Sequence, residues 1–333
     1  MDIIKDGKSS TSELLKKQRP FIYRTLGDRF FSYTIFGLGI TVILCTVLMA
    51  LVLYGDGAEA IKKFGFFGFL TSRVWDPGLS MEFGAYPFIL GTLITSVVAL
   101  AISFIPAIAV AIFTAEYSPR WLAHITDNLI NLIAAVPSVI IGIWGIFVFA
   151  PWMRDTFYMK LYMFSLDHFP SLLPFIGNPI GYGMATATLI LAIMIIPYTT
   201  VLTVDAFNKV PKEQREAAYA LGATKWEVIK MAVIPYARGG ILAGVMLSFG
   251  RAIGETMAVA MLIGNKNTLP FTLIGPAATM PSVIVNEFRE AVENLHLSSL
   301  IAVGFYLFII SLVVNLIAAY IQRKFSLTGA RTV

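Results

Sequence analysis

Six long runs of apolar residues, almost free of charge, constrain the fold of this chain more than any other feature. They lie near residues 30–54, 87–115, 128–150, 182–204, 239–264 and 298–321. About 20 apolar residues in a helix cross ~30 Å of hydrocarbon, so each run is long enough to span a membrane. With 57% hydrophobic and 14% charged residues, the chain has too little polar surface for a soluble domain. The runs lack the alternation of barrel strands, and we therefore predict an all-α, polytopic membrane bundle of six transmembrane helices.

Lysine and arginine are distributed unequally between the two sides of these predicted spans. Of 25 in all, seven lie in residues 1–29, one is Arg120, six lie in the loop 209–238 and three follow the last span. Cytoplasmic segments carry the excess of positive charge. Both termini and the loop 209–238 are therefore expected in the cytoplasm, and the net charge of +5 requires no nucleic acid to explain it.

These patterns divide the chain into segments. We expect a cytoplasmic tail or interfacial helix at 1–29, the first transmembrane helix at 30–54, an extracytoplasmic loop at 55–86, a membrane core at 87–323 that includes the loop 209–238, and a cytoplasmic tail at 324–333. The first 29 residues are too polar for the core of a signal peptide, so no cleavage is expected. Cys45 is the only cysteine, which excludes a disulfide framework within the chain.

The loop 209–238 has the residue pattern of two short helices joined by a turn. Pro211 can occupy a first helical turn, and residues 211–221 are predicted to be helical. Gly222 is suited to the left-handed conformation that ends a helix. Thr224 and Glu227 have the spacing of a capping box, which would start the second helix.

The first of these helices is suited to contact another protein. Ala217, Ala218 and Ala220 have small side chains that allow a second surface to approach closely, while Glu213, Arg215 and Glu216 supply charge around the helix. The alternative is that the loop is only a solvated connector.

Two charged residues, Arg251 and Glu255, lie within the fifth predicted span. Four residues apart in a helix, they would share one face. Each charge costs about 2.5–3.5 kcal/mol at the centre of a membrane helix, so both are expected to face the bundle interior or a water-filled cavity. They could form an ion pair that only specifies packing, or they could line a transport pathway. An arginine can bind an oxyanion and a nearby glutamate can limit its affinity, but this chemistry does not separate phosphate from sulfate or molybdate.

Small residues in the third predicted span favour close helix packing. Gly142 and Gly145 follow Pro137 and Ser138 and are expected to let this span approach a neighbour.

Several chemical functions are excluded by missing motifs. No Gly-x-x-x-x-Gly-Lys-Ser/Thr loop occurs, because Asp2 stands where the first glycine before Gly7-Lys8-Ser9 is required. His124, His168 and His296 have no spacing typical of metal ligands. We expect no catalytic residue, no metal site and no cofactor bound by this chain.

The residues Glu216-Ala217-Ala218, Gly222 and Pro235 resemble the coupling segment of ABC importer membrane subunits, which docks into a cytoplasmic ATPase. Ala232 and Ile234 stand where that pattern usually has Ile and Leu. Further along, Ala135–Val139, Phe249–Ala258 and Asn286–Phe288 with Ala291 are similar to permeases of the phosphate-specific transport system, more of the PstC type than the PstA type. The resemblance covers roughly residues 87–323.

This resemblance implies a type I importer permease, multi-pass in the inner or plasma membrane, that moves phosphate into the cytoplasm. Its implied partners are a homologous PstA-type permease, two PstB-type ATPase subunits that bind ATP and Mg, and an extracytoplasmic phosphate-binding protein. In that family, the residues matching Arg251 and Glu255 are associated with transport. The alternatives are a permease for sulfate or molybdate, or a secondary transporter or membrane scaffold that needs no ATPase.

Overall fold

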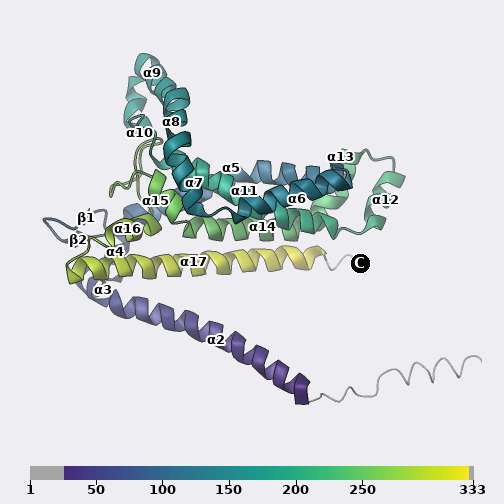
Figure 1. Ribbon diagram of the computed structural model, residues 1–333, viewed down its shortest axis with the longest axis horizontal. Coiled ribbons are helices and arrows are strands. Elements are labelled where there is room, and N and C mark those ends of the chain that lie inside the picture. Colours follow the sequence, from purple (N-terminus) through teal and green to yellow (C-terminus); the bar gives the residue numbers. More distant parts are fainter. Residues whose placement is uncertain (1–25, 330–333) are drawn as a thin grey trace, which may run out of the picture. The chain divides into compact units, whose positions relative to one another are not determined.

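The computed structural model describes residues 26–329, with side chains between 30 and 324. Most of this part of the chain is helical (Figure 1). It falls into two compact units, Met1–Val52 and Leu53–Val333. Most of the predicted tail at 1–29 lies outside the described residues, as do residues 330–333 of the predicted tail at 324–333.

The elements follow one another with short connections. The first half contains α2 (Leu26–Asp56), α3 (Ala58–Phe64), α4 (Phe66–Thr71), β1 (Trp75–Asp76), β2 (Glu82–Phe83), α5 (Tyr86–Ile112), η1 (Phe113–Tyr117), α6 (Arg120–Ala135), α7 (Ser138–Trp144), η2 (Gly145–Phe149), α8 (Ala150–Met153), η3 (Arg154–Tyr158), α9 (Met159–His168), η4 (Pro170–Leu172) and α10 (Leu173–Ile176). The second half contains α11 (Met184–Asn208), α12 (Lys212–Ala220), α13 (Lys225–Val228), η5 (Ile229–Val233), α14 (Ile234–Gly254), α15 (Met257–Leu262), α16 (Met280–Glu287) and α17 (Asn294–Gly329).

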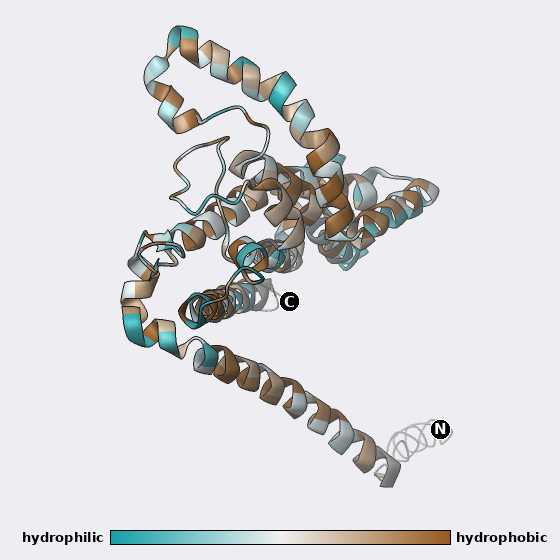
Figure 2. Ribbon diagram, turned by 60° about the vertical axis from the view of Figure 1, so that its left-hand side comes forward, coloured by the Kyte–Doolittle hydropathy of each residue, from teal (hydrophilic) through white to brown (hydrophobic). Residues whose placement is uncertain are grey.

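Among the described residues, six helical stretches are long and apolar enough to cross a membrane, which confirms the predicted number. They are Phe30–Asp56, Tyr86–Tyr117, Ser138–His168, Met184–Asn208, Lys225–Gly254 and Asn294–Lys324. Long hydrophobic stretches along α2 and α17 are plain in Figure 2. The first, second, fourth and sixth stretches lie close to their predicted positions.

The third span is displaced from the predicted 128–150. Helix α6 ends at Ala135, and the backbone of Val136 and Pro137 is extended, with ψ of 126° and 135°. Proline disfavours the helical conformation of the residue before it, so the chain leaves the helix at Val136. A new helix starts at Ser138, and residues up to His168 continue it. Much of the segment 151–181, expected to be an outer connection, therefore belongs to this helical stretch.

The fifth span also differs from the predicted 239–264. It begins earlier, at Lys225, and ends at Gly254. Glu255 has an extended backbone, with φ −69° and ψ 121°, and the chain becomes helical again only at Met257. Two helices with an interruption between them replace the single helix expected here.

Helix α11 is the centre of the bundle. About two thirds of its apolar stretch is buried, against a third or less for the other five stretches. It packs against α5 and α14, which run alongside it in Figure 1. Gly240 allows the close approach of α14, because a Cβ atom there would lie 2.3 Å from the Cβ of Ala206. The hydroxyls of Thr199 and Ser248 are 2.7 Å apart and form a hydrogen bond between α11 and α14.

The bundle of the second unit has two distinct ends. Helices α12 and α13 lie at one end with the start of α6, and this is the α12 end; α9, α10 and the β1–β2 hairpin lie at the other, the α10 end (Figure 1). At the α10 end a hydrophobic cluster forms around Phe69, which stacks on Tyr306 with 5.6 Å between ring centres. Trp75 and Phe83 join it, 4.9 Å apart. The aromatic residues of the segment 55–86 thus include buried packing residues.

Candidate functional site

Helix α12 (Lys212–Ala220) is one residue shorter at each end than the predicted helix 211–221, and it ends in the predicted glycine turn. Gly222 adopts φ +81°, the left-handed region where glycine carries no steric cost. Its N–H donates to the carbonyl of Tyr219 at 2.9 Å, and the N–H of Ala223 donates to Ala218 at 3.2 Å. The predicted capping box between Thr224 and Glu227 then starts α13. These bonds fix a compact helix–turn–helix at the α12 end.

The surface of α12 is open. No side chain of the helix is buried; Glu213, Glu216 and Ala217 are exposed and Ala218 is half-buried. Leu221 is 87% exposed. Gly222 and Pro235, the remaining residues expected to couple to an ATPase, are exposed as well. Tyr219 and Trp226 of the same helix–turn–helix are exposed as well, and several large apolar side chains among exposed charges are typical of a surface that another protein covers.

The inner side of α12 is attached to the bundle through charged residues. The guanidinium of Arg215 donates to the carboxylate of Glu116 at 2.8 Å and to the carbonyl of Phe207 at 2.8 Å. The Arg215 and Glu116 side chains are only 24% and 11% exposed. Nearby, the ammonium of Lys225 lies 4.5 Å from the ring centre of Tyr117. Force on α12 would therefore reach the ends of α5 and α11.

Arg251 and Glu255 do not share a helix face, so this prediction is wrong. Arg251 is exposed near the end of α14, whereas half-buried Glu255 lies in the extended segment after it. Among the described residues, Arg251 forms no ion pair with Glu255 or with any other carboxylate. Its guanidinium instead lies 4.4 Å from the ring centre of Tyr198. The Tyr198 hydroxyl donates to the carbonyl of Ala134 at 3.0 Å, at the end of α6.

The residues predicted to favour close helix packing, Pro137, Ser138 and Gly142, follow the end of α6. Pro137 precedes α7 and Ser138 is its first residue. Gly142 of α7 faces α15, because a Cβ atom there would lie 3.2 Å from the Cα of Ala258 and 2.7 Å from the sulfur of Met261. Helices α7 and α15 therefore pack closely against each other. Each of them follows a short non-helical segment, Val136-Pro137 before α7 and Glu255-Thr256 before α15.

The arrangement around Arg251 is suited to a transient anion. A guanidinium that rests on an aromatic ring keeps its N–H donors for another partner, and a planar fork of donors matches an oxyanion. An arginine at this depth in a membrane is stable only when it faces protein or water. Among residues 26–329, no three histidine, cysteine, aspartate or glutamate side chains gather closely enough to hold a metal ion.

Sequence reasoning missed Tyr198 and Glu116. Tyr198 follows Pro197 in the middle of an apolar run, and Glu116 is 99 residues from its partner Arg215. The one available signal for Glu116 was its charge at the end of an apolar run, beside Tyr117 and before Pro119.

Comparison with known proteins identifies the family. Residues 107–327 match the family described as "Binding-protein-dependent transport system inner membrane component". The chain belongs to this family. The inner membrane component is thus a transport protein that crosses the membrane several times.

Relatives of this chain match it over nearly its whole length. The phosphate transport system permease protein PstC of Mesorhizobium japonicum is 43% identical over 92% of this chain and 93% of its own length. PstC of Haemophilus influenzae is 40% identical over 96% of this chain and 100% of its own length.

Solved structures share the fold of this chain. The bacterial alginate ABC transporter, crystallised with its periplasmic protein, contains a chain that aligns with a TM-score of 0.58 at 16% identity, over 91% of this chain and 98% of that chain. The methionine transporter MetNI in an inward-facing conformation gives 0.52 at 15% identity, over 76% of this chain and 99% of that chain. The bundle therefore has the ABC importer permease fold.

Proposed function

We propose that this chain is one of two membrane subunits of an ATP-driven importer that carries inorganic phosphate into the cytoplasm. The observation that carries the proposal is Arg251, a guanidinium held on Tyr198 without a carboxylate partner among the described residues. The names of the relatives, which are phosphate transport system permeases, support phosphate as the anion.

ATP hydrolysis is coupled to transport at the α12 end. The distribution of lysine and arginine predicts that this end and both termini lie in the cytoplasm. Two ATPase subunits, which bind ATP and Mg, dock on the exposed surface of Glu216, Ala217, Ala218 and Leu221. When they close on ATP, they push α12. The buried pair Arg215–Glu116 passes this displacement to α5 and α11, on which α14 and Arg251 rest.

The anion crosses beside Arg251. Arg251 is exposed when this chain is considered without a partner. A homologous second permease therefore covers the face of the bundle that carries Arg251 and encloses the pathway. An extracytoplasmic binding protein delivers phosphate at the α10 end. Glu255 is the first residue after Arg251's helix, and its negative charge keeps the anion from binding too tightly to leave.

The test is uptake by the complete transporter in proteoliposomes. Labelled phosphate is supplied with the binding protein and ATP, and unlabelled phosphate, sulfate or molybdate is added in excess. We expect that only unlabelled phosphate competes. Competition by sulfate or molybdate alone would assign another oxyanion. Uptake without ATP, or failure of an ATPase to co-purify through the 209–238 loop, would contradict the proposal and favour a secondary transporter or a scaffold.

A further inference from the structure

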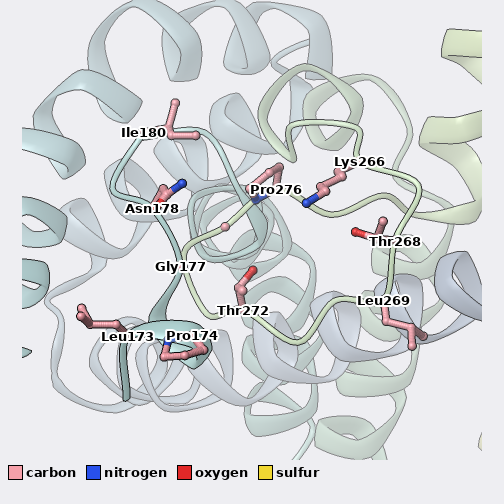
Figure 3. A pocket seen from close by; sticks show the side chains of 11 residues that line it. Leu173, Pro174, Gly177, Asn178, Ile180, Lys266, Thr268, Leu269, Thr272 and Pro276 are labelled. Carbon is pink, nitrogen blue, oxygen red and sulfur yellow. The ribbon is translucent and has the colours of Figure 1, made fainter. Parts of the chain in front are cut away.

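A cavity of about 500 Å³ lies at the α10 end, between the loop 173–180 and the loop 266–276 (Figure 3). Lys266, Thr268 and Thr272 from one loop and Asn178 from the other supply its polar side chains. In Figure 3 the ammonium of Lys266 and the hydroxyls of Thr268 and Thr272 turn toward the space between the loops. None of the four side chains has a hydrogen-bond partner in the described part of the chain.

The two loops are fixed against each other by backbone hydrogen bonds. The N–H of Leu273 donates to Phe175 at 2.8 Å, and the N–H of Ile274 donates to Ile176 at 2.9 Å. Gly177 has φ +86°, and a Cβ atom there would lie 3.1 Å from the backbone nitrogen of Gly275. The cavity is therefore a built feature of the fold, because its walls are joined at their base.

The backbone around Lys266 is held on both sides. The amide of Asn265 donates to Ala260 at 2.7 Å, and the amide of Asn267 donates to Glu287 at 2.6 Å. The N–H of Lys266 itself donates to Ala277 at 3.1 Å. The side chain of Lys266, in contrast, forms no ion pair with any described carboxylate. The backbone of Lys266 is thus held in place, while its ammonium lies at the cavity without an ion-pair partner among the described residues.

The chemistry of the lining selects one class of ligand. It offers one ammonium, two hydroxyls and one amide, and none of its eleven residues is acidic. These groups are hydrogen-bond donors that suit an oxyanion. A lysine ammonium is a strongly hydrated point charge, which suits brief and exchangeable binding better than the planar fork of an arginine. An anion on a transport path must bind well enough to enter and weakly enough to leave.

The cavity is also close to Arg251 along the chain. Helix α15 leads from the interruption at Glu255 to the loop that carries Lys266, and its six residues rise by only about 9 Å. We propose that the cavity is an outer holding site for a tetrahedral oxyanion, inorganic phosphate, between its release at the α10 end and its contact with Arg251. This inference rests on the proposed function.

The test uses the complete transporter in proteoliposomes with a saturating concentration of phosphate-loaded binding protein. Lys266→Gln removes the charge, Lys266→Arg retains it, and Lys160→Gln removes an equivalent charge from exposed α9 at the same end. We expect Lys266→Gln to lower the initial rate of phosphate uptake about two- to fivefold, the effect of one exposed charge interaction. Lys160→Gln should match the wild type at equal amounts of inserted complex, and Lys266→Arg, which keeps the charge, should lose less than Lys266→Gln.

Two results would overturn the holding site while leaving the proposed function intact. One is wild-type uptake by Lys266→Gln. The other is a defect that disappears as the binding protein is raised, since Lys266 would then contact that protein rather than the anion. If the wild-type transporter takes up no phosphate at all, the proposed function fails and the holding site fails with it.

Discussion

The guanidinium of Arg251 lies 4.4 Å from the centre of the Tyr198 ring, and the hydroxyl of Tyr198 donates to Ala134 at 3.0 Å. One aromatic side chain thus joins the end of α14 to the end of α6, the two places where long helices stop inside the bundle. Contact with an aromatic face is worth about 0.5–2 kcal/mol to a cation. The ring therefore holds the charge in position while its donors stay available.

Two substitutions of Tyr198 separate the contact of its ring with Arg251 from the hydrogen bond of its hydroxyl to Ala134. Tyr198→Phe keeps the ring below Arg251 and removes the hydrogen bond to Ala134, so we expect near-normal uptake and a loss of about 0.6–1.7 kcal/mol in stability. Tyr198→Leu removes the ring as well and should lower uptake by about two- to thirtyfold. Initial rates of phosphate uptake at equal insertion measure the difference. Equal rates for the two variants would show that the ring does not position Arg251.

Gly222 tests the shape of the coupling segment. A Cβ atom at this position would meet nothing within 4 Å, so only the backbone conformation at φ +81° requires glycine. Gly222→Ala should cost about 1–2 kcal/mol in that conformation, whereas asparagine adopts it more readily. We expect Gly222→Ala to reduce co-purification of the ATPase about fivefold or more, and Gly222→Asn to reduce it less. If alanine and asparagine behave alike, the left-handed turn is not what the ATPase recognises.

The ion pair between Glu116 and Arg215 should transmit force rather than bind the ATPase. Glu116→Gln leaves the largely buried Arg215 without a carboxylate partner, which should cost about 1–3 kcal/mol of stability. We expect ATP hydrolysis to continue while the phosphate taken up per ATP falls. Asp205→Asn, an exposed carboxylate of α11, is the control. The exchange of Glu116→Arg with Arg215→Glu should restore part of the coupling, and no recovery would argue against a direct role of the pair.

Much of this architecture follows from local sequence. The number of spans could be predicted because about 20 apolar residues suffice to cross the membrane, and the turn at Gly222 and the capping box at Thr224 depend on neighbouring residues alone. Hydropathy does not reveal where an apolar helix stops. Val136-Pro137 and Glu255-Thr256 therefore interrupt helices that composition alone would continue.

Contacts between distant segments could not be predicted from one sequence. Arg215 meets Glu116 only because α11 packs on α5, and Arg251 meets Tyr198 only because α14 packs on α11. Arg251 and Glu255 stand out in the sequence as charges in an apolar run, but their spacing predicted a shared helix face, which the extended backbone at Glu255 does not provide. Periodicity gives the face of one helix and not the side chain opposite it.

Glu287 is expected to hold the α10 end together. Its carboxylate accepts hydrogen bonds from the Trp75 indole at 2.8 Å and the Asn267 amide at 2.6 Å, and it lies 2.9 Å from Nε2 of His296. Glu287→Gln should lower the free energy of unfolding by about 1–3 kcal/mol, because charge-assisted bonds to a poorly exposed group are lost. Thermal unfolding in detergent measures this, with exposed Glu290→Gln as the control. Equal shifts for both variants would contradict the role of Glu287.

The separate roles of α12 and Arg251 can be measured as ATP hydrolysis and phosphate uptake in the same proteoliposomes, for the wild-type transporter and for Arg251→Gln. The proposed mechanism couples ATP hydrolysis to transport through α12 and binds the anion at Arg251. It therefore predicts that Arg251→Gln keeps hydrolysis stimulated by the binding protein and loses uptake by about tenfold or more, as expected for a lost hydrogen bond to a charged group. Unchanged uptake at normal insertion would contradict it.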